Sequence, residues 1–343
     1  MATINTNVTI VVTTIFPPTK SLLRLADMAK AVGWKLIVVG DRKTPSNFFV
    51  QGARYLSLQD QVDSEWKLAT GLPCNHYARK NLGYLDAMAL GAGRIVETDD
   101  DNTPLPSFFS PIESTVSCRV VRDAGWANVY RLFSAENVWP RGFPLDRVRT
   151  DPPVASDILE SMYCPIQQGL ADDDPDVDAI YRLVIGAPII FDKKPPVALA
   201  PGALCPINSQ NTAWWPDAYP LLYLPSNCSF RLTDIWRGLI AIRIAAEQGW
   251  NILFRPANIR QERNEHDLMD DFAKELDGYL RASGIARILA DIPLPTGSGQ
   301  LPEAMILCYE ALCAAKVFPH EEIKLVESWL SDIEQAKRRL TSD

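Results

Sequence analysis

Three consecutive carboxylates, Asp99, Asp100 and Asp101, directly follow Arg94–Thr98 (RIVET), a short predicted strand. A strand that ends in three carboxylates concentrates negative charge, which a hard divalent cation such as Mn²⁺ or Mg²⁺ relieves. Such a cation can also bridge to a diphosphate. We therefore expect the alternate residues Asp99 and Asp101 to hold a metal. A solvated acidic turn remains the alternative interpretation, although the position after a buried strand weakens it.

Basic residues near the same part of the chain suit an anionic ligand. Arg42 and Lys43 follow the segment 34–40, and Arg79 and Lys80 lie in the helical pattern 75–91. Arginine suits bidentate contacts with phosphate, whereas lysine acts as a point charge. Phosphate contacts are the functional prediction, and solvated surface is the alternative for each pair.

Two further charged residues suggest chemistry. Asp234 begins the apolar helical pattern 234–250, where it could take a proton from an acceptor hydroxyl as a general base, or simply cap the helix. Arg141 lies in VWPRGFPLDR, 138–147, among aromatic, proline and glycine residues. That composition predicts a rigid loop that holds a single cation.

A second acidic run, DDDPDVD at 172–178, precedes a short helical pattern. Asp174 suits a helix cap and Pro175 suits a first helical turn. Acidity at a helix start is thus the favoured interpretation, and the alternative is that Asp176 or Asp178 faces an acceptor.

The common signatures of other enzyme classes are absent from the sequence. His76, His266 and His320 lack zinc-site spacing, although His266 could complete a metal shell. There is no GxGxxG, no P-loop and no GxSxG, which argues against the usual dinucleotide, NTPase and hydrolase sites.

The elements that would position these residues begin with two buried strands. NVTIVVTTI, 7–15, and WKLIVVG, 34–40, are short and rich in β-branched residues. Between them, a helix over 21–33 is predicted by apolar residues at helical spacing, with Thr19 as its cap. A strand–helix–strand unit of this kind implies a parallel sheet.

Polar residues fall where these strands end. Thr13 and Thr14 lie at the end of the first strand, Asp41 follows the second, and Asp99–Asp101 follow the strand 94–98. Ligands of open α/β sheets bind outside the carboxyl ends of the strands. The topology therefore predicts one shared ligand site at Thr13, Thr14, Asp41 and the acidic run.

The remainder of the chain divides near residue 256. A helix over 234–250 and a strand over 251–255 close the α/β part, and beyond residue 257 three helical patterns follow at 264–283, 301–315 and 320–340. We predict an α/β domain over 1–256 and a helical extension over 257–343.

Composition limits the class of partner. The chain has 343 residues and a net charge of −8, which disfavours nucleic acid as the main partner. It has no stretch of the ~18 apolar residues that a spanning helix needs. A cytoplasmic location without a transmembrane segment is the expectation.

Several blocks of the sequence, in order, resemble the STELLO glycosyltransferase family. They are VVTTIFPPT (11–19), GWKLIVVGDRKTP (33–45), YARKNLGYLDAMALGAGRIVETDDDN (77–102), VWPRGFPLDRV (138–148), PDVDAIYRL (175–183), FDKKPPVALAPGALCPINSQNT (191–212) and DIWRG (234–238). The resemblance implies a GT-A-like (Rossmann-like) fold, in which a mixed, mostly parallel sheet is flanked by helices. It also implies a UDP-sugar donor, a divalent metal and Asp234 in the place of the catalytic carboxylate.

A more distant similarity is to the reversibly glycosylated polypeptides, which are UDP-arabinopyranose mutases. Their RGxP arginine is self-glycosylated, and Arg141 corresponds to it. The continuation PLDR, 144–147, departs from the mutase pattern. Ligand contact, glycosylation and loop structure therefore remain alternative roles for Arg141.

Residues and resemblance together predict a metal-dependent glycosyltransferase that moves a sugar from a nucleotide-sugar to a glycan or other hydroxyl acceptor. A nucleotide-sugar mutase and a non-catalytic sugar-nucleotide-binding module are the alternatives. The predicted site consists of catalytic Asp234 and Arg141, metal ligands Asp99 and Asp101, and donor-binding Thr13, Thr14, Asp41, Lys43, Arg79, Lys80, Asp99 and Asp100.

Overall fold

The structure is a computed structural model that describes residues 7–186, 188–262 and 267–342. Its centre is an eleven-stranded sheet in the order β3-β2-β1-β4-β12-β9-β13-β10-β6-β8, with β5 paired to β13. In chain order the strands are β1 (Val8–Thr13), β2 (Lys35–Val39), β3 (Ala53–Leu56), β4 (Arg94–Thr98), β5 (Asn102–Pro104), β6 (Thr115–Val121), β8 (Glu160–Tyr163), β9 (Ile166–Asp172), β10 (Val197–Leu199), β12 (Asn211–Trp214) and β13 (Ile252–Gln261).

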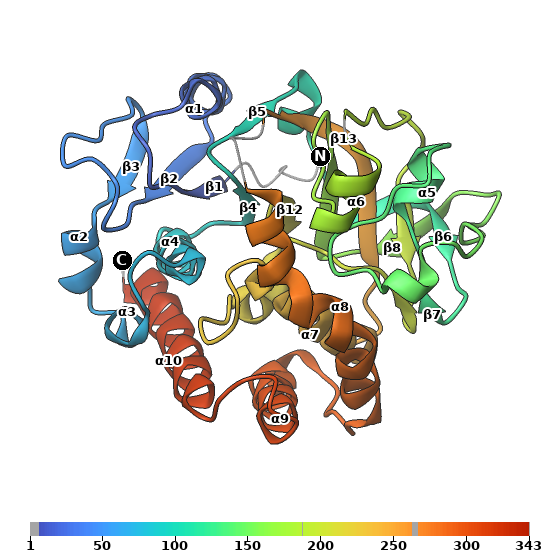
Figure 1. Cartoon of the computed structure of the whole chain (residues 1–343). Coiled ribbons are helices and arrows are strands. Elements are labelled where there is room, and N and C mark those ends of the chain that lie inside the picture. The colour runs from blue at the N-terminus through green and yellow to red at the C-terminus, as the bar shows by residue number, and fades with distance from the viewer. Residues whose placement is uncertain (1–6, 187, 263–266, 343) are drawn as a thin grey trace.

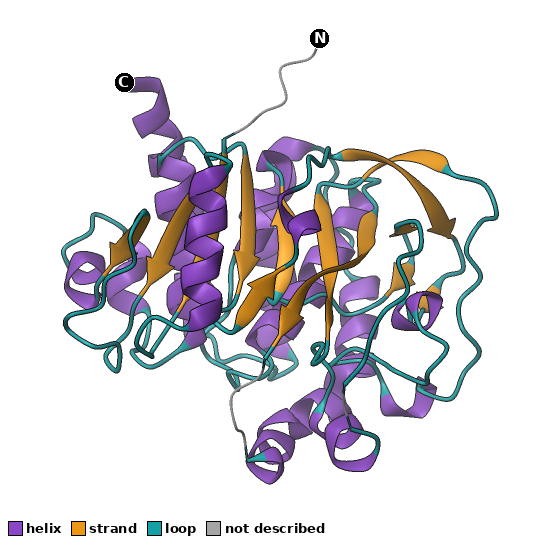
Figure 2. Ribbon diagram, turned by 90° about the horizontal axis from the view of Figure 1, so that it is seen from above, coloured by secondary structure: helices purple, strands orange, loops and turns teal. Residues whose placement is uncertain are grey.

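The sheet is mixed and mostly parallel. Strands β3, β2, β1 and β4 run parallel to one another, β12 is antiparallel to β4 and β9, and β13 is again parallel to β9. Helices flank the sheet on both faces (Figure 2). This is the GT-A-like α/β architecture predicted from the sequence.

Alternation along β1 and β2 builds the two hydrophobic cores. Val11 and Ile37 belong to the larger core, whereas Ile10 and Leu36 belong to the core on the other face. Because successive side chains of a strand point to opposite faces, one apolar strand serves both cores. Helix α4 (Lys80–Ala89) packs in the larger core and α1 (Lys20–Ala31) in the other.

Helix α1 begins and ends where the sequence predicts. Thr19 Oγ1 accepts a hydrogen bond from the Leu22 amide, which makes Thr19 the N-cap, and Gly33 follows the helix with φ +74°. The left-handed backbone at Gly33 explains why the helix can turn sharply into β2.

Several predicted boundaries change. Two short helices, α2 (Leu58–Val62) and α3 (Lys67–Gly71), precede the predicted helical pattern 75–91. The pattern at 75–91 is a 3-10 turn, Tyr77–Arg79, followed by α4. The last strand, β13, reaches Gln261, because it also pairs with β5, so the predicted division after residue 256 falls inside it.

The cap predicted in the second acidic run was wrong. Helix α6 (Ala179–Val184) is capped by Asp178, which accepts a hydrogen bond from the Tyr181 amide. Asp174 and Pro175 precede that cap, and Asp174 pairs with Arg182 instead.

Helices α7 (Thr233–Glu247), α8 (Leu268–Asp291), α9 (Leu301–Ala314) and α10 (Glu321–Ser342) cover the larger core (Figure 1). Leu289, Met305 and Trp329 of the last three helices lie in the same cluster as Val11 and Ile37. The C-terminal helices and the sheet therefore share one core, and Figure 1 shows α10 beside α3 and α4.

Short elements complete the fold. They are α5 (Tyr130–Phe133), β7 (Gly125–Trp126), β11 (Ala203–Leu204), and 3-10 turns at Pro106–Phe109, Leu145–Arg147, Pro216–Leu222 and Ser298–Gln300. Of the helices within the described ranges, none has the length and apolar character needed to cross a membrane.

Candidate functional site

The carboxyl ends of β1, β2 and β4 open into a pocket of about 400 Å³. The predicted site residues that line this pocket are Thr13, Thr14, Asp41, Lys43, Arg79, Asp99, Asp100, Asp101, Arg141 and Asp234. Lys80, the remaining predicted residue, lies behind the lining with its side chain fully buried. The parallel start of the sheet thus brings together residues that are far apart in the sequence, as the strand-end rule requires.

Each carboxylate of the Asp99–Asp101 run has a different environment. Asp99 Oδ1 accepts hydrogen bonds from the Tyr77 hydroxyl at 2.7 Å and from Lys80 Nζ at 3.2 Å. Asp101 accepts from Gln261 Nε2 at 3.1 Å. Asp100 accepts from Thr14 Oγ1 at 2.5 Å, and burial raises the pKa of its carboxyl to about 6.

Lys80 orients the acidic run from behind. Its ammonium donates to the Thr98 carbonyl and the Tyr77 hydroxyl, each at 2.7 Å, as well as to Asp99. An ammonium has three N–H donors, and these contacts use them. The structure therefore directs Lys80 at Asp99 and Tyr77, whereas the sequence suggested a phosphate contact.

Arg79 lies at the other end of the pocket, near Asp41. Its Nε donates to Gln61 at 2.6 Å and its Nη1 to the Leu72 carbonyl at 3.1 Å. The Nη2 atom is buried and has no hydrogen-bond partner among the described residues. Burial lowers the pKa of Arg79, and Asp41 partly opposes that effect. A ligand group with an acceptor oxygen would complete its hydrogen bonding.

Asp41 is fixed by the backbone around it. Its Oδ1 accepts from the Arg42 amide at 2.6 Å and its Oδ2 from the His76 amide at 3.0 Å. These bonds join the end of β2 to the turn before α4. Lys43 lies in the same loop and lines the pocket.

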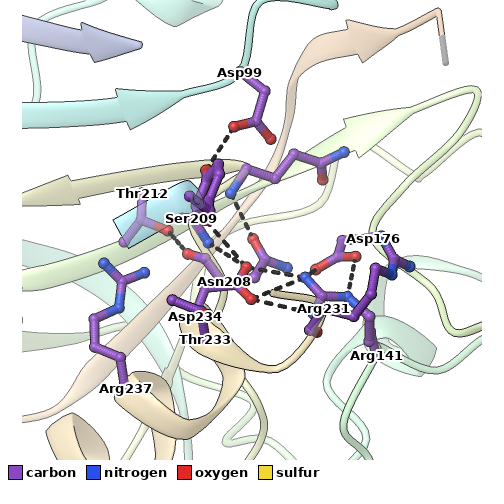
Figure 3. A network of polar contacts seen from close by, with 12 residues as sticks. Asp99, Arg141, Asp176, Asn208, Ser209, Thr212, Arg231, Thr233, Asp234 and Arg237 are labelled. Carbon is purple, nitrogen blue, oxygen red and sulfur yellow. Dashed lines mark hydrogen bonds and ion pairs between the residues drawn. The ribbon is translucent and has the colours of Figure 1, made fainter. Parts of the chain in front are cut away.

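The opposite side of the pocket is built on one arginine between two carboxylates (Figure 3). Arg141 donates to Asp176 through Nε at 2.7 Å and Nη2 at 2.8 Å. It reaches Asp234 through Nη2 at 2.9 Å and Nη1 at 3.1 Å, and Nη1 also donates to the Arg231 carbonyl. The five N–H groups of Arg141 thus all have acceptors within the protein.

These three side chains are buried, so their charges interact strongly. Burial lowers the pKa of the Arg141 guanidinium, but Asp176 and Asp234 outweigh burial and hold that pKa well above its usual value. Burial raises the pKa of Asp176, and Arg141 offsets the rise only in part. For Asp234 burial also opposes the charge, but Arg141, Arg237 and the Ser209 amide together lower the pKa.

Asp234 lies in the first turn of α7, but its carboxylate is turned towards the pocket rather than capping the helix. It accepts from the Ser209 amide and lies 3.1 Å from the Ser209 hydroxyl. The same hydroxyl is 2.8 Å from the Tyr77 hydroxyl, which donates to Asp99. Ser209 and Tyr77 therefore connect the two sides of the pocket.

Sequence reasoning missed several pocket residues. Tyr77, Ser209 and Gln261 line the pocket, and Asp176 was considered only as an alternative. The three-residue spacing of Tyr77 and Lys80 is the one local signal that could have linked Tyr77 to Asp99. His266 lies outside the described residues.

Helix α10 supports the site from outside. Glu322 accepts hydrogen bonds from the amides of Ser226 and Asn227 and from the Tyr223 hydroxyl. Asp332 accepts from the amides of Lys67 and Leu68 at the start of α3. Both carboxylates are fully buried, so α10 fixes the segment before α7 and the segment before Arg79.

The carboxylates that could hold a metal are Asp99 and Asp101. The described ranges contain no group of three or more His, Cys, Asp or Glu arranged to hold a metal ion. Mg²⁺ commonly binds through one or two carboxylates together with the phosphates of a substrate. The oxygen donors of Asp99 and Asp101 at the pocket surface fit that mode of binding.

The strand order and the pocket define a GT-A-like α/β protein. A family model of STELLO glycosyltransferases matches residues 231–341. Two Arabidopsis thaliana proteins, Probable glycosyltransferase STELLO2 and Probable glycosyltransferase STELLO1, are each 27% identical to the chain. These alignments cover 97% and 90% of this chain. They confirm the predicted resemblance to the STELLO glycosyltransferases.

The chain spans less than half the length of these relatives, 45% of STELLO2 and 42% of STELLO1. Two solved structures are also similar to it. A mycobacterial protein has a TM-score of 0.42 at 12% identity, covering 81% of this chain and 75% of that protein. The M. tuberculosis glucosyl-3-phosphoglycerate synthase has a TM-score of 0.41 at 12% identity, covering 84% and 81%. The GT-A-like fold is therefore inferred from the order and direction of the strands and not from these two structures.

Proposed function

We propose that the protein is a metal-dependent glycosyltransferase that moves a sugar from a UDP-linked donor to a glycan or another hydroxyl acceptor. The observation that carries the proposal is the single pocket at the ends of β1, β2 and β4. One side of it presents the carboxylates Asp99–Asp101, and the other presents Asp176 and Asp234. The resemblance to the STELLO glycosyltransferases supports the same class of reaction.

In this proposal the nucleoside occupies the end of the pocket at Thr13, Thr14 and Asp41. The unpaired Nη2 of Arg79 then donates to a carbonyl oxygen of the base, which suits uracil. Lys43 is exposed to the same end and would meet a phosphate as a point charge.

Asp99 and Asp101 would hold Mn²⁺ or Mg²⁺ at the diphosphate. When bound, the cation neutralises the charge of the departing diphosphate. The protein's part is to fix the carboxylates: Tyr77 and Lys80 hold Asp99, and Gln261 holds Asp101. Asp100 faces Thr14 and would lie beside the donor.

The contacts of Arg141 favour a positioning role over a glycosylation site. A guanidinium that is buried, protonated and bonded through all five N–H groups is a poor nucleophile. This argues for the transferase over a mutase that acts through a glycosylated arginine. Incubation with a UDP-sugar alone separates the two: a new UDP-sugar isomer would support the mutase, whereas slow release of UDP supports the transferase.

Calorimetric titration with UDP, with and without Mn²⁺, tests the donor site. We expect Mn²⁺-dependent binding by the wild type and its loss in the double variant Asp99→Asn/Asp101→Asn. The control is Asp146→Asn, an exposed carboxylate outside the pocket. If the double variant binds UDP with undiminished Mn²⁺ dependence, the metal assignment is wrong. If the wild type fails to bind UDP under either condition, the proposed donor is wrong.

A further inference from the structure

Asp176 and Asp234 share Arg141, line the same pocket and are equally buried, yet they differ in how many hydrogen bonds they accept. A carboxylate has about four lone-pair positions. A carboxylate whose positions are filled by fixed donors is a poor proton acceptor, because a proton must displace one of those donors. The number and kind of donors therefore distinguish the two residues.

The Asp234 carboxylate is saturated. Its Oδ1 lies 3.1 Å from both Nη1 and Nη2 of Arg141. Its Oδ2 is 2.9 Å from Arg141 Nη2, 3.1 Å from the Ser209 amide and 3.1 Å from the Ser209 hydroxyl. These donors come from two separate segments of the chain, and they hold Asp234 as a permanent anion that orients Arg141 and Ser209.

Among the residues that the structure describes, the Asp176 carboxylate accepts one hydrogen bond through each oxygen, from Nε and Nη2 of Arg141. Both donors lie on one edge of the carboxylate and come from the same side chain. The remaining lone pairs belong to a residue that lines the pocket. The neighbouring Asp178 differs, because the Tyr181 amide and the Trp139 indole bind its two oxygens and it caps α6.

We propose that Asp176, and not Asp234, is the general base that deprotonates the acceptor hydroxyl. The proposal rests on the glycosyltransferase function proposed above. In the step, a carboxylate oxygen of Asp176 takes the hydroxyl proton while the acceptor oxygen forms a bond to the anomeric carbon. The bond from that carbon to the diphosphate breaks, and UDP leaves with the electron pair. Asp176 later releases the proton to water. A single displacement of this kind inverts the anomeric centre.

The charges around the two carboxylates agree with this division. Burial raises the pKa of Asp176, whereas the donors around Asp234 lower its pKa despite burial. Environments that push two pKa values apart separate a proton acceptor from a fixed anion. The charged or titratable groups that act on Asp176 are Arg141, Arg231, Asp234, Asp178 and Tyr130. A general base is more effective as its pKa approaches the working pH.

Hydrolysis of UDP-glucose, UDP-galactose and UDP-xylose in Mn²⁺, with water as acceptor, provides the first test. We expect Asp176→Asn to reduce UDP release by 10²- to 10⁴-fold, the usual contribution of a general base. Its affinity for UDP should stay within about twofold of the wild type, because donor contacts are untouched. Asp173→Asn, in the same acidic run but paired with the exposed Arg260, is the matched control and should hydrolyse donors like the wild type.

Azide then separates a base from a positioning residue. Azide is an anionic nucleophile that needs no deprotonation, so it should restore turnover to Asp176→Asn and yield a glycosyl azide of inverted configuration. It should leave Asp234→Asn inactive, because that variant loses the anchor of Arg141 and Ser209. Rescue of Asp234→Asn in place of Asp176→Asn would overturn the assignment, as would wild-type hydrolysis by Asp176→Asn.

A measurement without turnover tests the inference even if hydrolysis is too slow to follow or a variant does not fold. In wild-type protein labelled with ¹³Cγ-aspartate, the Asp176 carboxyl should titrate above the ordinary range of aspartate and Asp234 below it. The reverse order would overturn the inference while leaving the glycosyltransferase proposal in place. Absence of UDP binding by the wild type would instead remove the proposed function itself.

Discussion

The two sides of the pocket balance their charge in different ways. On the donor side, the buried Lys80 pairs with Asp99, whose side chain is 28% exposed and faces the pocket. On the acceptor side, Arg141 is enclosed between Asp176 and Asp234, and these three side chains are 7–8% exposed. The donor side can thus accept positive charge from a ligand, whereas the acceptor side supplies its own. A site whose charges are fixed before substrate arrives needs little reorganisation during reaction.

The largest expected effect on stability comes from removing Arg141, the cation of the acceptor side. Arg141→Met leaves two buried carboxylates without their partner, and loss of one member of a buried ion pair typically costs about 3–5 kcal/mol. We expect a fall of that size in the free energy of unfolding in urea. The control Lys337→Met removes an exposed pair with Glu334 and should leave stability unchanged. A loss below about 1 kcal/mol in Arg141→Met would contradict the enclosed triad.

Removing one negative charge from the donor side should instead increase the free energy of unfolding. The folded pKa of Asp100, about 6, lies above its ordinary value of 3.8 because of burial, so ionised Asp100 costs stability. We expect Asp100→Asn to raise the free energy of unfolding by on the order of 2–3 kcal/mol above pH 6, since one pKa unit is about 1.4 kcal/mol. The gain should shrink between pH 6 and pH 4 and vanish below pH 4, where Asp100 is protonated in both states.

Urea unfolding of Asp100→Asn at pH 8, 6 and 4 measures this dependence. Asp123→Asn, a substitution of an exposed aspartate, is the matched control. A constant difference across the three pH values would show that the charge of Asp100 is not its cause.

The support supplied by α10 should have a smaller effect that reaches the acceptor side. Glu322→Gln weakens the bonds to the Ser226 and Asn227 amides and to the Tyr223 hydroxyl. Leaving buried donors unsatisfied costs about 1–3 kcal/mol. Hydrogen exchange should report faster exchange at the Ser226 and Asn227 amides, with the Arg42 and His76 amides at Asp41 unchanged. Equal acceleration at all four amides would indicate global rather than local loosening.

The smallest expected effect concerns Arg79. Arg79→Lys keeps a cation near Asp41 but removes the planar guanidinium, whose N–H groups bind Gln61 and the Leu72 carbonyl and whose Nη2 is left for a ligand. We expect about tenfold weaker UDP binding by calorimetry, equivalent to about 1.4 kcal/mol. Arg54→Lys, at an exposed ion pair with Asp86, serves as the control. Unchanged UDP affinity in Arg79→Lys would remove Arg79 from the base-binding end.

The donor side could be predicted from the sequence because it depends on short-range patterns. Val8–Thr13 and Arg94–Thr98 are recognisable strands, and a parallel start to the sheet is enough to place Thr14, Asp41 and Asp99 at one edge. The direction of Lys80 and the position of Arg79 needed side-chain geometry, because helix spacing alone does not say which neighbour a cation reaches.

The acceptor side could not be predicted in the same way. Arg141 is 35 residues from Asp176 and 93 from Asp234, and no local period links them. Strand β12 also enters the sheet antiparallel between β4 and β9, which four residues of mixed character do not reveal. Long-range pairing of this kind depends on the complete fold.

The two buried carboxylates of α10 have a consequence for the order of events during protein synthesis. Asp332 binds the Leu68 amide across 264 residues of chain, and Glu322 binds the Ser226 amide across 96. At about 5–20 residues per second, a ribosome needs roughly 13–53 s to make the stretch between Leu68 and Asp332. During that time the start of α3 has no partner in α10, and the segment before α7 is without its partner for roughly 5–19 s at the same rate. A nascent chain without α10 therefore lacks the two carboxylates that hold the start of α3 and the segment before α7.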